Sequence, residues 1–560
     1  MIKVKINILF FLCFISFLNA QEKKPNILWI VCEDICPTLS MYGDFTAKTP
    51  NLDKLAKQCI IYNNSFATTG VCAASRSAII TGMLPSSIGT MHMRTAADVA
   101  SWGRRTYNEF LTIGSTVREE HAVDLKGNTI RDYSVVIPAN IKCFPEYLRA
   151  VGYYCTNNAK TDYQFAAPIS AWDENDNKAH WRNRPKGMPF FSVFNIDDTH
   201  ESKLWGNKDL PLTVDPASVP VPPYLPDNKI ARNDIARHYS NIEIMDKKVG
   251  ALLDELKQAG LYDNTIIFFY SDHGGPLPHQ KREIYEYGLK TPLLIKGINQ
   301  KNSEVSNRLI SFTDLGPTVL SLANVKPPQG LDGKSFMGKY ISKPRKYVYG
   351  TSDRFDEFTD RIRTVRTEQY VYIKNYYPNF TKYKDVLYRK SVPLMMNMLE
   401  LKENNQLNAI QMSWFQTKEK EELYDSKKDP FSLVNLASKP EYKSVLEELR
   451  SECSKQFDQK FDFATLAESE MILNMWPNNS QPKTEVPNFK IKDKTVSLSC
   501  ITKGSSISYI ISDSKNEKFD LNSNWLLYSK PIQCTSGKYI YVIANRIGFK
   551  DSNITQFQFE

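Results

Sequence analysis

The 560-residue chain is too long for one minimal domain, and its length favours roughly two to four structural units. Its 42% hydrophobic and 24% charged residues exclude a disordered chain, and 12% aromatic residues suit large cores or sugar handling. The formal charge of +9 weakly favours a polyanionic partner. Because the basic residues are scattered and form no recognition motif, we expect no nucleic-acid partner, and a solvated surface of mixed charge is the simpler interpretation.

The N-terminal segment has the layout of an export signal. Lys3 and Lys5 precede an apolar run over residues 6–18, and the segment ends on Ala20 before a polar stretch. The run is too short to span a bilayer comfortably, and no later stretch approaches about 20 uninterrupted apolar residues. We therefore predict a signal peptide over residues 1–20 and an exported protein that is not embedded in a membrane. The periplasm is the first choice, with secretion or display on the cell surface as alternatives.

Three nearly continuous apolar runs, over residues 26–31, 190–194 and 265–270, are typical of strands buried on both faces of a parallel sheet. Helix-like segments separate them, so the predicted fold class is α/β. Each run is soon followed by ionisable residues. Because ligand sites of open α/β sheets lie outside the carboxyl ends of strands, we expect these residues to converge on one crevice: Glu33 and Asp34, then Asp197, Asp198 and His200, and finally Asp272 and His273.

The rest of the chain divides into smaller units. An amphipathic pattern over residues 442–457 predicts a helix in a C-terminal subdomain, and short alternating runs after residue 495 predict an all-β module. A stretch rich in Pro, Asn and Ser between them is typical of a linker. The predicted organisation is a signal peptide over 1–20, an α/β domain over 21–365, a C-terminal subdomain over 366–470, a linker over 471–490 and a β-module over 491–560.

Cysteine usage fits an oxidising compartment. Ten cysteines include one in the predicted signal, so nine remain and at least one is unpaired. Cys143 with Cys155, and Cys500 with Cys534, are plausible disulfides, although sequence does not establish the pairing.

The strongest local motif is VCAASRSAIITG over residues 71–82. The pattern that begins at Cys72, includes Arg76 and closes on Thr-Gly resembles the maturation signature of type I sulfatases, a branch of the alkaline phosphatase superfamily. The resemblance implies that a formylglycine-generating or anaerobic sulfatase-maturating enzyme oxidises Cys72 to formylglycine (3-oxoalanine), the nucleophile. Ala74 stands where the family more often has proline. A buried helix cysteine that acts as a small hydrophobe is the alternative.

The resemblance runs from about Pro25 to Leu466 and covers most of the chain. It implies an alkaline-phosphatase-like α/β core with a small C-terminal subdomain, and hydrolysis of a sulfate ester to an alcohol and sulfate. The last module resembles the chitobiase C-terminal type of β-sandwich, in which Trp525 and Tyr528 fit a core better than a sugar platform. The phrases KTDY, THES and KREIYEYGLKTP are most similar to polysaccharide sulfatases of marine bacteria that act on ulvan or carrageenan, which implies a sulfated carbohydrate substrate.

The resemblance also implies a calcium site. Glu33, Asp34, Asp272 and His273 match the family's metal ligands in position, and modified Cys72 completes the set. A divalent metal supplies the positive charge that sulfate-ester hydrolysis needs, and hard oxygen ligands favour calcium or magnesium over zinc. The family usually has Asp at the Glu33 position and often Asn at the His273 position. Carboxylates that cap helix N-termini are the alternative interpretation.

Other positions match the family's catalytic groups. Lys281 and Lys160 resemble the lysines that neutralise the sulfate oxygens, and Arg76 would hold the formylglycine. His200, in DDTHES, resembles the histidine that protonates the leaving alcohol, a role that suits a group titrating near neutral pH. Asp162 stands where the family normally has histidine, and it could accept a hydrogen bond from the hydrated aldehyde.

Further residues are predicted to contact the sugar, with simple surface positions as the alternative: His92 and Arg94 in GTMHMR, and Asp353 and Arg354 in SDRFDE. Two other functions are weighed against the sulfatase. A phosphatase or phosphonate hydrolase on the same core usually has Thr or Ser in place of Cys72. A non-catalytic sulfated-glycan-binding protein would not need the intact motif residues.

Overall fold

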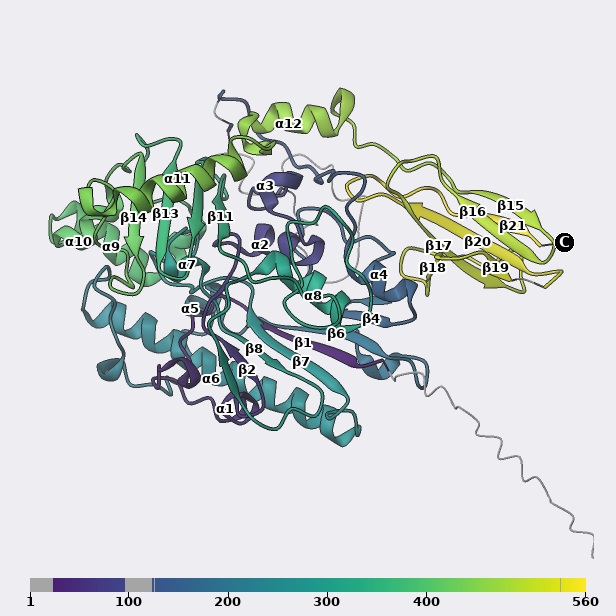
Figure 1. Cartoon of the computed structure of the whole chain (residues 1–560), viewed down its shortest axis with the longest axis horizontal. Coiled ribbons are helices and arrows are strands. Elements are labelled where there is room, and N and C mark those ends of the chain that lie inside the picture. The colour runs from purple at the N-terminus through teal and green to yellow at the C-terminus, as the bar shows by residue number, and fades with distance from the viewer. Residues whose placement is uncertain (1–23, 96–122, 125, 534, 560) are drawn as a thin grey trace, which may run out of the picture.

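The computed structural model describes residues 24–95, 123–124, 126–533 and 535–559. The predicted signal peptide over residues 1–20 lies outside this part of the chain. Within the described ranges, no helix is long and apolar enough to cross a bilayer. An α/β core, a four-stranded antiparallel sheet and a C-terminal β-sandwich follow one another along the chain (Figure 1).

Eight strands form the central sheet, in the order β5-β4-β6-β1-β7-β8-β2-β9. The three predicted runs are confirmed as the adjacent parallel strands β6 (Phe190–Ile196), β1 (Asn26–Cys32) and β7 (Thr265–Ser271). β1 lies in the middle, so the carboxyl ends of all three open onto the same edge. The other strands are β4 (Tyr154–Asn158), β5 (Glu174–Asn175), β8 (Leu293–Lys296), β2 (Ile60–Tyr62) and β9 (Glu304–Ser306).

Alternate side chains of β1 enter two hydrophobic cores on opposite faces of the sheet. Leu28 and Ile30 pack against α1 (Pro50–Ala56) and the long α6 (Lys229–Gln258). Ile27 and Trp29 pack on the other face, which is covered by helices α2 (Cys72–Thr81), α4 (Pro145–Ala150) and α8 (Leu315–Leu322) (Figure 1). Burial on both faces explains why the strand is apolar at nearly every position.

A second sheet packs beside the core. Its four strands are antiparallel: β11 (Val348–Ser352), β12 (Ile362–Arg366), β13 (Tyr370–Asn375) and β14 (Glu421–Asp425). The predicted amphipathic helix is α11 (Lys443–Phe457), which packs its apolar face on this sheet. The predicted boundary between residues 365 and 366 falls inside β12, and this sheet begins upstream of it because β12 hydrogen-bonds to β11 as well as to β13.

The predicted linker is partly helical. Residues 471–475 belong to α12 (Glu468–Met475), and the next residue, Trp476, is fully buried and donates its indole N–H to the Ser134 carbonyl oxygen at 3.1 Å. The first residues of the predicted linker therefore pack against the core.

The remaining α-helices and strands are α3 (Pro85–Ile88), α5 (Ser202–Gly206), α7 (Glu286–Leu289), α9 (Pro393–Glu403), α10 (Ala409–Met412), β3 (Ser65–Phe66) and β10 (Ile310–Ser311).

The C-terminal module is a β-sandwich with its own core. One sheet contains β15 (Asn488–Lys492), β16 (Thr495–Ser499) and β19 (Ile532–Gln533), and the other contains β18 (Leu526–Leu527), β17 (Ser506–Ser512), β20 (Tyr539–Asn545) and β21 (Thr555–Gln558). Trp525 is 3% exposed and packs in a buried cluster, in agreement with a core role. The module lies beside α4 (Figure 1), where Arg149 donates to the Trp525 carbonyl oxygen at 2.7 Å.

The predicted disulfide between Cys143 and Cys155 is not formed. Both residues are reduced cysteines buried in the core, and Cys155 Sγ faces the Pro145 carbonyl oxygen at 3.8 Å. Cys500 is also a free thiol and donates to the Glu485 carbonyl oxygen. Its predicted partner, Cys534, lies outside the described residues.

Candidate active site

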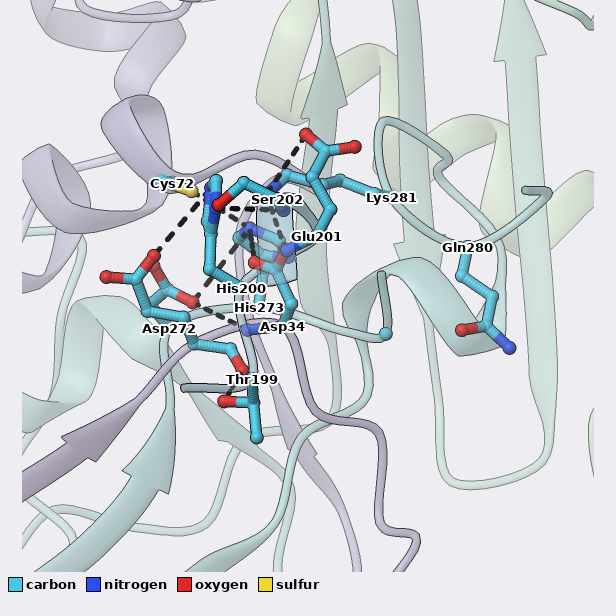
Figure 2. Close-up of polar contacts among 12 residues, drawn as sticks. Asp34, Cys72, Thr199, His200, Glu201, Ser202, Asp272, His273, Gln280 and Lys281 are labelled. Atoms are coloured by element: carbon cyan, nitrogen blue, oxygen red, sulfur yellow. Dashed lines mark hydrogen bonds and ion pairs between the residues drawn. The ribbon is translucent and has the colours of Figure 1, made fainter. Parts of the chain in front are cut away.

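Residues from all three predicted clusters meet at the carboxyl edge of the central sheet (Figure 2). From the second cluster only His200 is among them, because Asp197 pairs with Lys203 at 2.9 Å and Asp198 with Lys248 at 2.7 Å. Glu33 and Asp34 follow β1, His200 lies in the loop after β6, and Asp272 and His273 follow β7. Because these strands are adjacent and parallel, their ends deliver side chains to one place. All five residues are at most 9% exposed, so the site is a buried polar cluster.

Cys72 is the first residue of α2, and the helix points its N-terminus into this cluster. Cys72 Sγ lies 3.3 Å from His273 Nε2, and Ser75 one turn along donates its hydroxyl to the Asp272 carbonyl oxygen at 2.5 Å. Gly82, in the left-handed region with φ 70°, ends the helix. The motif residues therefore form one buried helix whose first side chain enters the site.

The donor atoms around Cys72 suit a cation. His273 Nδ1 lies 3.0 Å from the Gly274 carbonyl oxygen, where a neutral ring donates its N–H. The lone pair of Nε2 then faces Asp34 Oδ1 at 3.1 Å and Cys72 Sγ at 3.3 Å. Burial lowers the pKa of His273, but the charges of Asp272 and Asp34 outweigh it and raise that pKa to about 10. Acceptors this close require a positive charge between them, which is a proton or a metal ion.

Unsatisfied oxygens support the same interpretation. Glu33 Oε1 and Asp34 Oδ1 are buried without a hydrogen-bond donor among the described residues. Two groups of potential ligand atoms share Cys72, each with its atoms within 4.8 Å of one another. One group contains Glu33, Asp34, Cys72 and His200, and the other contains Cys72, Asp272 and His273. The two groups include every predicted ligand, and they add His200, which was not predicted as a ligand. The residues present thus fit a divalent cation.

Three cationic side chains surround these acids. Lys160 Nζ donates to Glu33 Oε2 at 2.7 Å, and Lys281 Nζ donates to Asp34 Oδ2 at 2.6 Å. Arg76 Nε donates to Asp272 Oδ2 at 3.0 Å, and its Nη1 donates to Asn195 Oδ1 at 2.7 Å. The structure therefore brings the predicted lysines and Arg76 into direct contact with the predicted metal ligands.

His200 has a defined orientation. Its Nδ1 accepts the Ser202 backbone N–H at 3.2 Å, so the neutral ring carries its proton on Nε2, which lies 3.9 Å from Glu33 Oε2. Burial and the charge of Lys281 lower the pKa of His200 well below its ordinary value. The imidazole is thus neutral and turns its N–H towards the cluster.

Asp162 is a buried carboxylate that accepts no hydrogen bond from the described part of the chain. It is 1% exposed, and neither oxygen has a donor among the described residues. Lys160 Nζ is 3.8 Å away, beyond hydrogen-bonding distance. Arg94 is partly buried nearby, and the charges of Asp162 and Asp356 raise its pKa although burial lowers it. Both residues lie at the site, and their contact with a bound group stays a prediction.

The other predicted sugar-binding residues are engaged inside the protein. Arg354 is fully buried and donates through Nη2 to Glu468 Oε1 at 2.7 Å, while His92 Nε2 lies 3.6 Å from Glu468 Oε2. Asp353 is fully buried beside Arg363, with Nη2 and Oδ1 at 2.9 Å. These contacts engage the three side chains inside the protein, and their contact with sugar stays a prediction.

Sequence reasoning missed a second layer of charge. Glu201 accepts both terminal nitrogens of Arg282 at 2.9 Å, and Arg282 Nε donates to Asp356 at 3.2 Å. Glu201 and Arg282 directly follow His200 and Lys281 in the chain. Adjacency to predicted residues is the one signal that could have found them, because an ion pair across 81 residues leaves no local pattern.

Comparison with known proteins agrees with this geometry. The family model described as Sulfatase matches residues 25–325, and the one described as N-sulphoglucosamine sulphohydrolase, C-terminal, matches residues 277–413. The chain therefore belongs to the sulfatase family, whose members are sulfuric ester hydrolases, and it has their alkaline-phosphatase-like α/β core.

Individual relatives extend over most of the chain. An ulvan-active sulfatase of Formosa agariphila is 42% identical, with 95% of this chain and 91% of that protein covered. Human N-sulphoglucosamine sulphohydrolase is 24% identical, with 78% and 90% covered. A solved structure of a 2-O GAG sulfatase shares the fold, with a TM-score of 0.54 at 20% identity over 79% of this chain and 94% of the other. The predicted family and fold are confirmed.

Proposed function

We propose that this sulfatase removes sulfate from a sulfated polysaccharide or oligosaccharide, with ulvan as the first candidate, by means of calcium and a formylglycine made from Cys72. The observation that carries the proposal is the convergence of Cys72 Sγ, His273 Nε2 and Asp34 Oδ1 between two lysines. Ulvan is the first candidate because a relative with 42% identity is described as ulvan-active.

The residues that would hold calcium are Glu33, Asp34, Asp272 and His273, together with residue 72 after oxidation. When bound, the metal would supply Lewis-acid polarisation of a sulfate oxygen, and the hydrated aldehyde would supply an oxygen nucleophile. The Cys72 thiol sulfur marks where the hydrate oxygens would stand. Arg76, held by Asp272 and Asn195, would fix residue 72 on its helix.

The chain's own side chains would handle charge and protons. Lys160 and Lys281 would exchange their carboxylate partners for sulfate oxygens, which places two ammonium groups on a developing negative charge. His200 would donate a hydrogen bond from its Nε2–H to the oxygen of the leaving alcohol, because its Nδ1 accepts the Ser202 backbone N–H and the neutral ring therefore carries its proton on Nε2. A buried site strengthens each of these interactions over its value in water.

We also propose that the protein is exported to the periplasm and that a formylglycine-generating or anaerobic sulfatase-maturating enzyme modifies Cys72. The predicted leader supports export, and the motif around Cys72 supports maturation. Sulfated oligosaccharides imported from a degraded polymer would meet the enzyme there.

The test compares the matured protein with its Cys72→Ser variant on a panel of sulfated oligosaccharides that includes ulvan fragments. Free sulfate is measured, and mass spectrometry of the peptide carrying residue 72 reports the aldehyde. We expect sulfate release from the matured protein and none from the variant, with an unchanged circular dichroism spectrum. Cys453→Ser, at another buried cysteine remote from the site, should retain activity. Release of sulfate by Cys72→Ser would overturn the mechanism, and tight binding of glycans without release by the matured protein would favour a binding protein.

A further inference from the structure

Glu201 is a buried carboxylate that touches the metal-site acid Asp34 through its own backbone. Its side chain is 2% exposed, and its N–H donates to Asp34 Oδ2 at 2.7 Å. It directly follows His200, so the loop after β6 presents a histidine and a carboxylate to the same cluster (Figure 2). The backbone contact ties the position of Glu201 to that of Asp34.

The carboxylate of Glu201 is fixed in place. Both of its oxygens accept from Arg282 at 2.9 Å, in the two-pronged geometry that guanidinium and carboxylate groups favour. Arg282 is itself held by Asp356 at 3.2 Å and by the Gly70 carbonyl oxygen, which accepts its backbone N–H at 2.7 Å. A side chain at residue 70 would come within 2.4 Å of the Glu283 carbonyl oxygen, so only glycine permits this approach. Glu201 is therefore a rigid negative group.

Lys281 lies between two acids. Its Nζ donates to Asp34 Oδ2 at 2.6 Å and lies 3.4 Å from Glu201 Oε1. The ammonium is 1% exposed and must keep a negative partner, because an unpaired buried charge is costly. If Asp34 were its single partner, any cation that binds Asp34 would compete with the lysine. A second fixed carboxylate relieves that competition.

From these contacts we infer that Glu201 is a positioning residue that holds the Lys281 ammonium when Asp34 engages calcium. It thereby strengthens calcium binding and keeps the lysine beside the sulfate position. The inference rests on the proposed calcium site. It adds a residue that neither binds the metal nor touches the reacting atoms.

The first experiment measures calcium affinity by isothermal titration calorimetry on the full-length, unmatured protein, so the readout does not depend on turnover. Glu201→Gln keeps the shape but removes the charge, and we expect calcium affinity to fall by about 10–100-fold, the usual effect of losing a group that orients metal ligands. Glu201→Asp restores the charge on a shorter side chain and should recover part of that loss.

The matched control is Glu283→Gln. Glu283 is also a 2% exposed carboxylate and lies two residues after Lys281 in the loop after β7, but its partners are Lys384 and Arg389 rather than Lys281. The Glu283→Gln variant should lose thermal stability without losing calcium affinity.

A second experiment uses the matured enzyme. Glu201→Gln should raise KM for a sulfated oligosaccharide by a larger factor than it lowers kcat, since the lysine that binds sulfate is misplaced.

The outcomes separate the two proposals. If the unaltered protein binds calcium and Glu201→Gln binds it equally well, the role of Glu201 is refuted while the calcium site stands. If Glu201→Asp is as weak as Glu201→Gln, charge is not what matters, and the inference also fails. If the unaltered protein binds no calcium, both the proposed calcium site and the role of Glu201 are refuted. Should Glu201→Gln not fold, the titration of Glu201→Asp against Glu283→Gln decides the question in the same way.

Discussion

Arg354 and Glu468 form a buried ion pair that fastens α12 to the loop after β11. Arg354 Nη2 lies 2.7 Å from Glu468 Oε1, and the guanidinium is fully buried. The Tyr133 hydroxyl donates to the same carboxylate at 2.9 Å, and His92 Nε2 lies 3.6 Å from it. Glu468 thus joins three segments that are more than 100 residues distant from it in sequence.

Loss of this carboxylate should cost much of the protein's stability. Glu468→Ala leaves the Arg354 guanidinium buried and unpaired, and we expect the free energy of unfolding to fall by about 3–5 kcal/mol. Urea denaturation followed by tryptophan fluorescence measures the change. Glu470→Ala, on the same helix but at an exposed ion pair with Lys126, should change it by less than about 0.5 kcal/mol. Equal effects of the two variants would contradict the assignment.

The same cluster predicts acid sensitivity. Burial raises the pKa of Glu468, but Arg354 and His92 outweigh it and lower that pKa to about 2, while burial lowers the pKa of His92 to about 4. Both groups bind protons more readily in the unfolded chain, so the free energy of unfolding falls as the pH drops. His92 contributes to this loss between about pH 6.5 and pH 4, and Glu468 contributes between about pH 4.3 and pH 2. Thermal melts across this range should show it. Glu468→Gln should flatten the lower part of the curve, and an unchanged curve would count against the linkage.

Asp162 should matter for turnover and little for stability. Because its oxygens lack hydrogen bonds among the described residues, Asp162→Asn should shift the free energy of unfolding by no more than about 1 kcal/mol. We expect sulfate release by the matured enzyme to fall by about 10²–10⁴-fold, the range for a lost proton acceptor. Asp162→His, which places the family's usual residue there, should recover part of the rate. Full activity of the Asn variant would show that the carboxylate is dispensable.

Arg149 should hold the C-terminal sandwich on the core. It donates to the carbonyl oxygens of Ile169, Ser170 and Trp525 and to Asp173. Arg149→Ala leaves the three carbonyl oxygens and the Asp173 carboxylate without this donor. We expect faster proteolytic cleavage around residues 477–486, and the free energy of unfolding should fall by about 3–5 kcal/mol. Arg232→Ala, at an exposed pair with Asp227, is the control and should leave the cleavage rate unchanged. If both variants are cleaved alike, the sandwich is held by other contacts.

Sequence predicted what local patterns encode. The apolar runs of β1, β6 and β7 follow from burial on both faces, and the Cys72 motif follows from one helix with fixed spacing. What failed depends on distant partners. The start of the second sheet could not be read because β11 and β12 are short and separated by an irregular loop. The shared partner of His92 and Arg354 could not be predicted because that residue, Glu468, lies in a stretch next to the predicted linker, and their contact with sugar stays a prediction.

The second layer of charge gives the site a property that individual contacts do not reveal. Among the described acids, lysines and arginines, six carboxylates face five cations in the cluster around Cys72: Glu33, Asp34, Asp162, Glu201, Asp272 and Asp356 against Arg76, Arg94, Lys160, Lys281 and Arg282. The raised pKa of His273 adds one proton before a metal binds, so the metal-free cluster has no net charge and does not attract an anionic sugar sulfate. A divalent cation that replaces this proton gives the cluster one excess positive charge, which matches the single negative charge of a sulfate monoester. We therefore expect an obligatory order of loading, in which the ion enters first and the anionic sugar is attracted only afterwards.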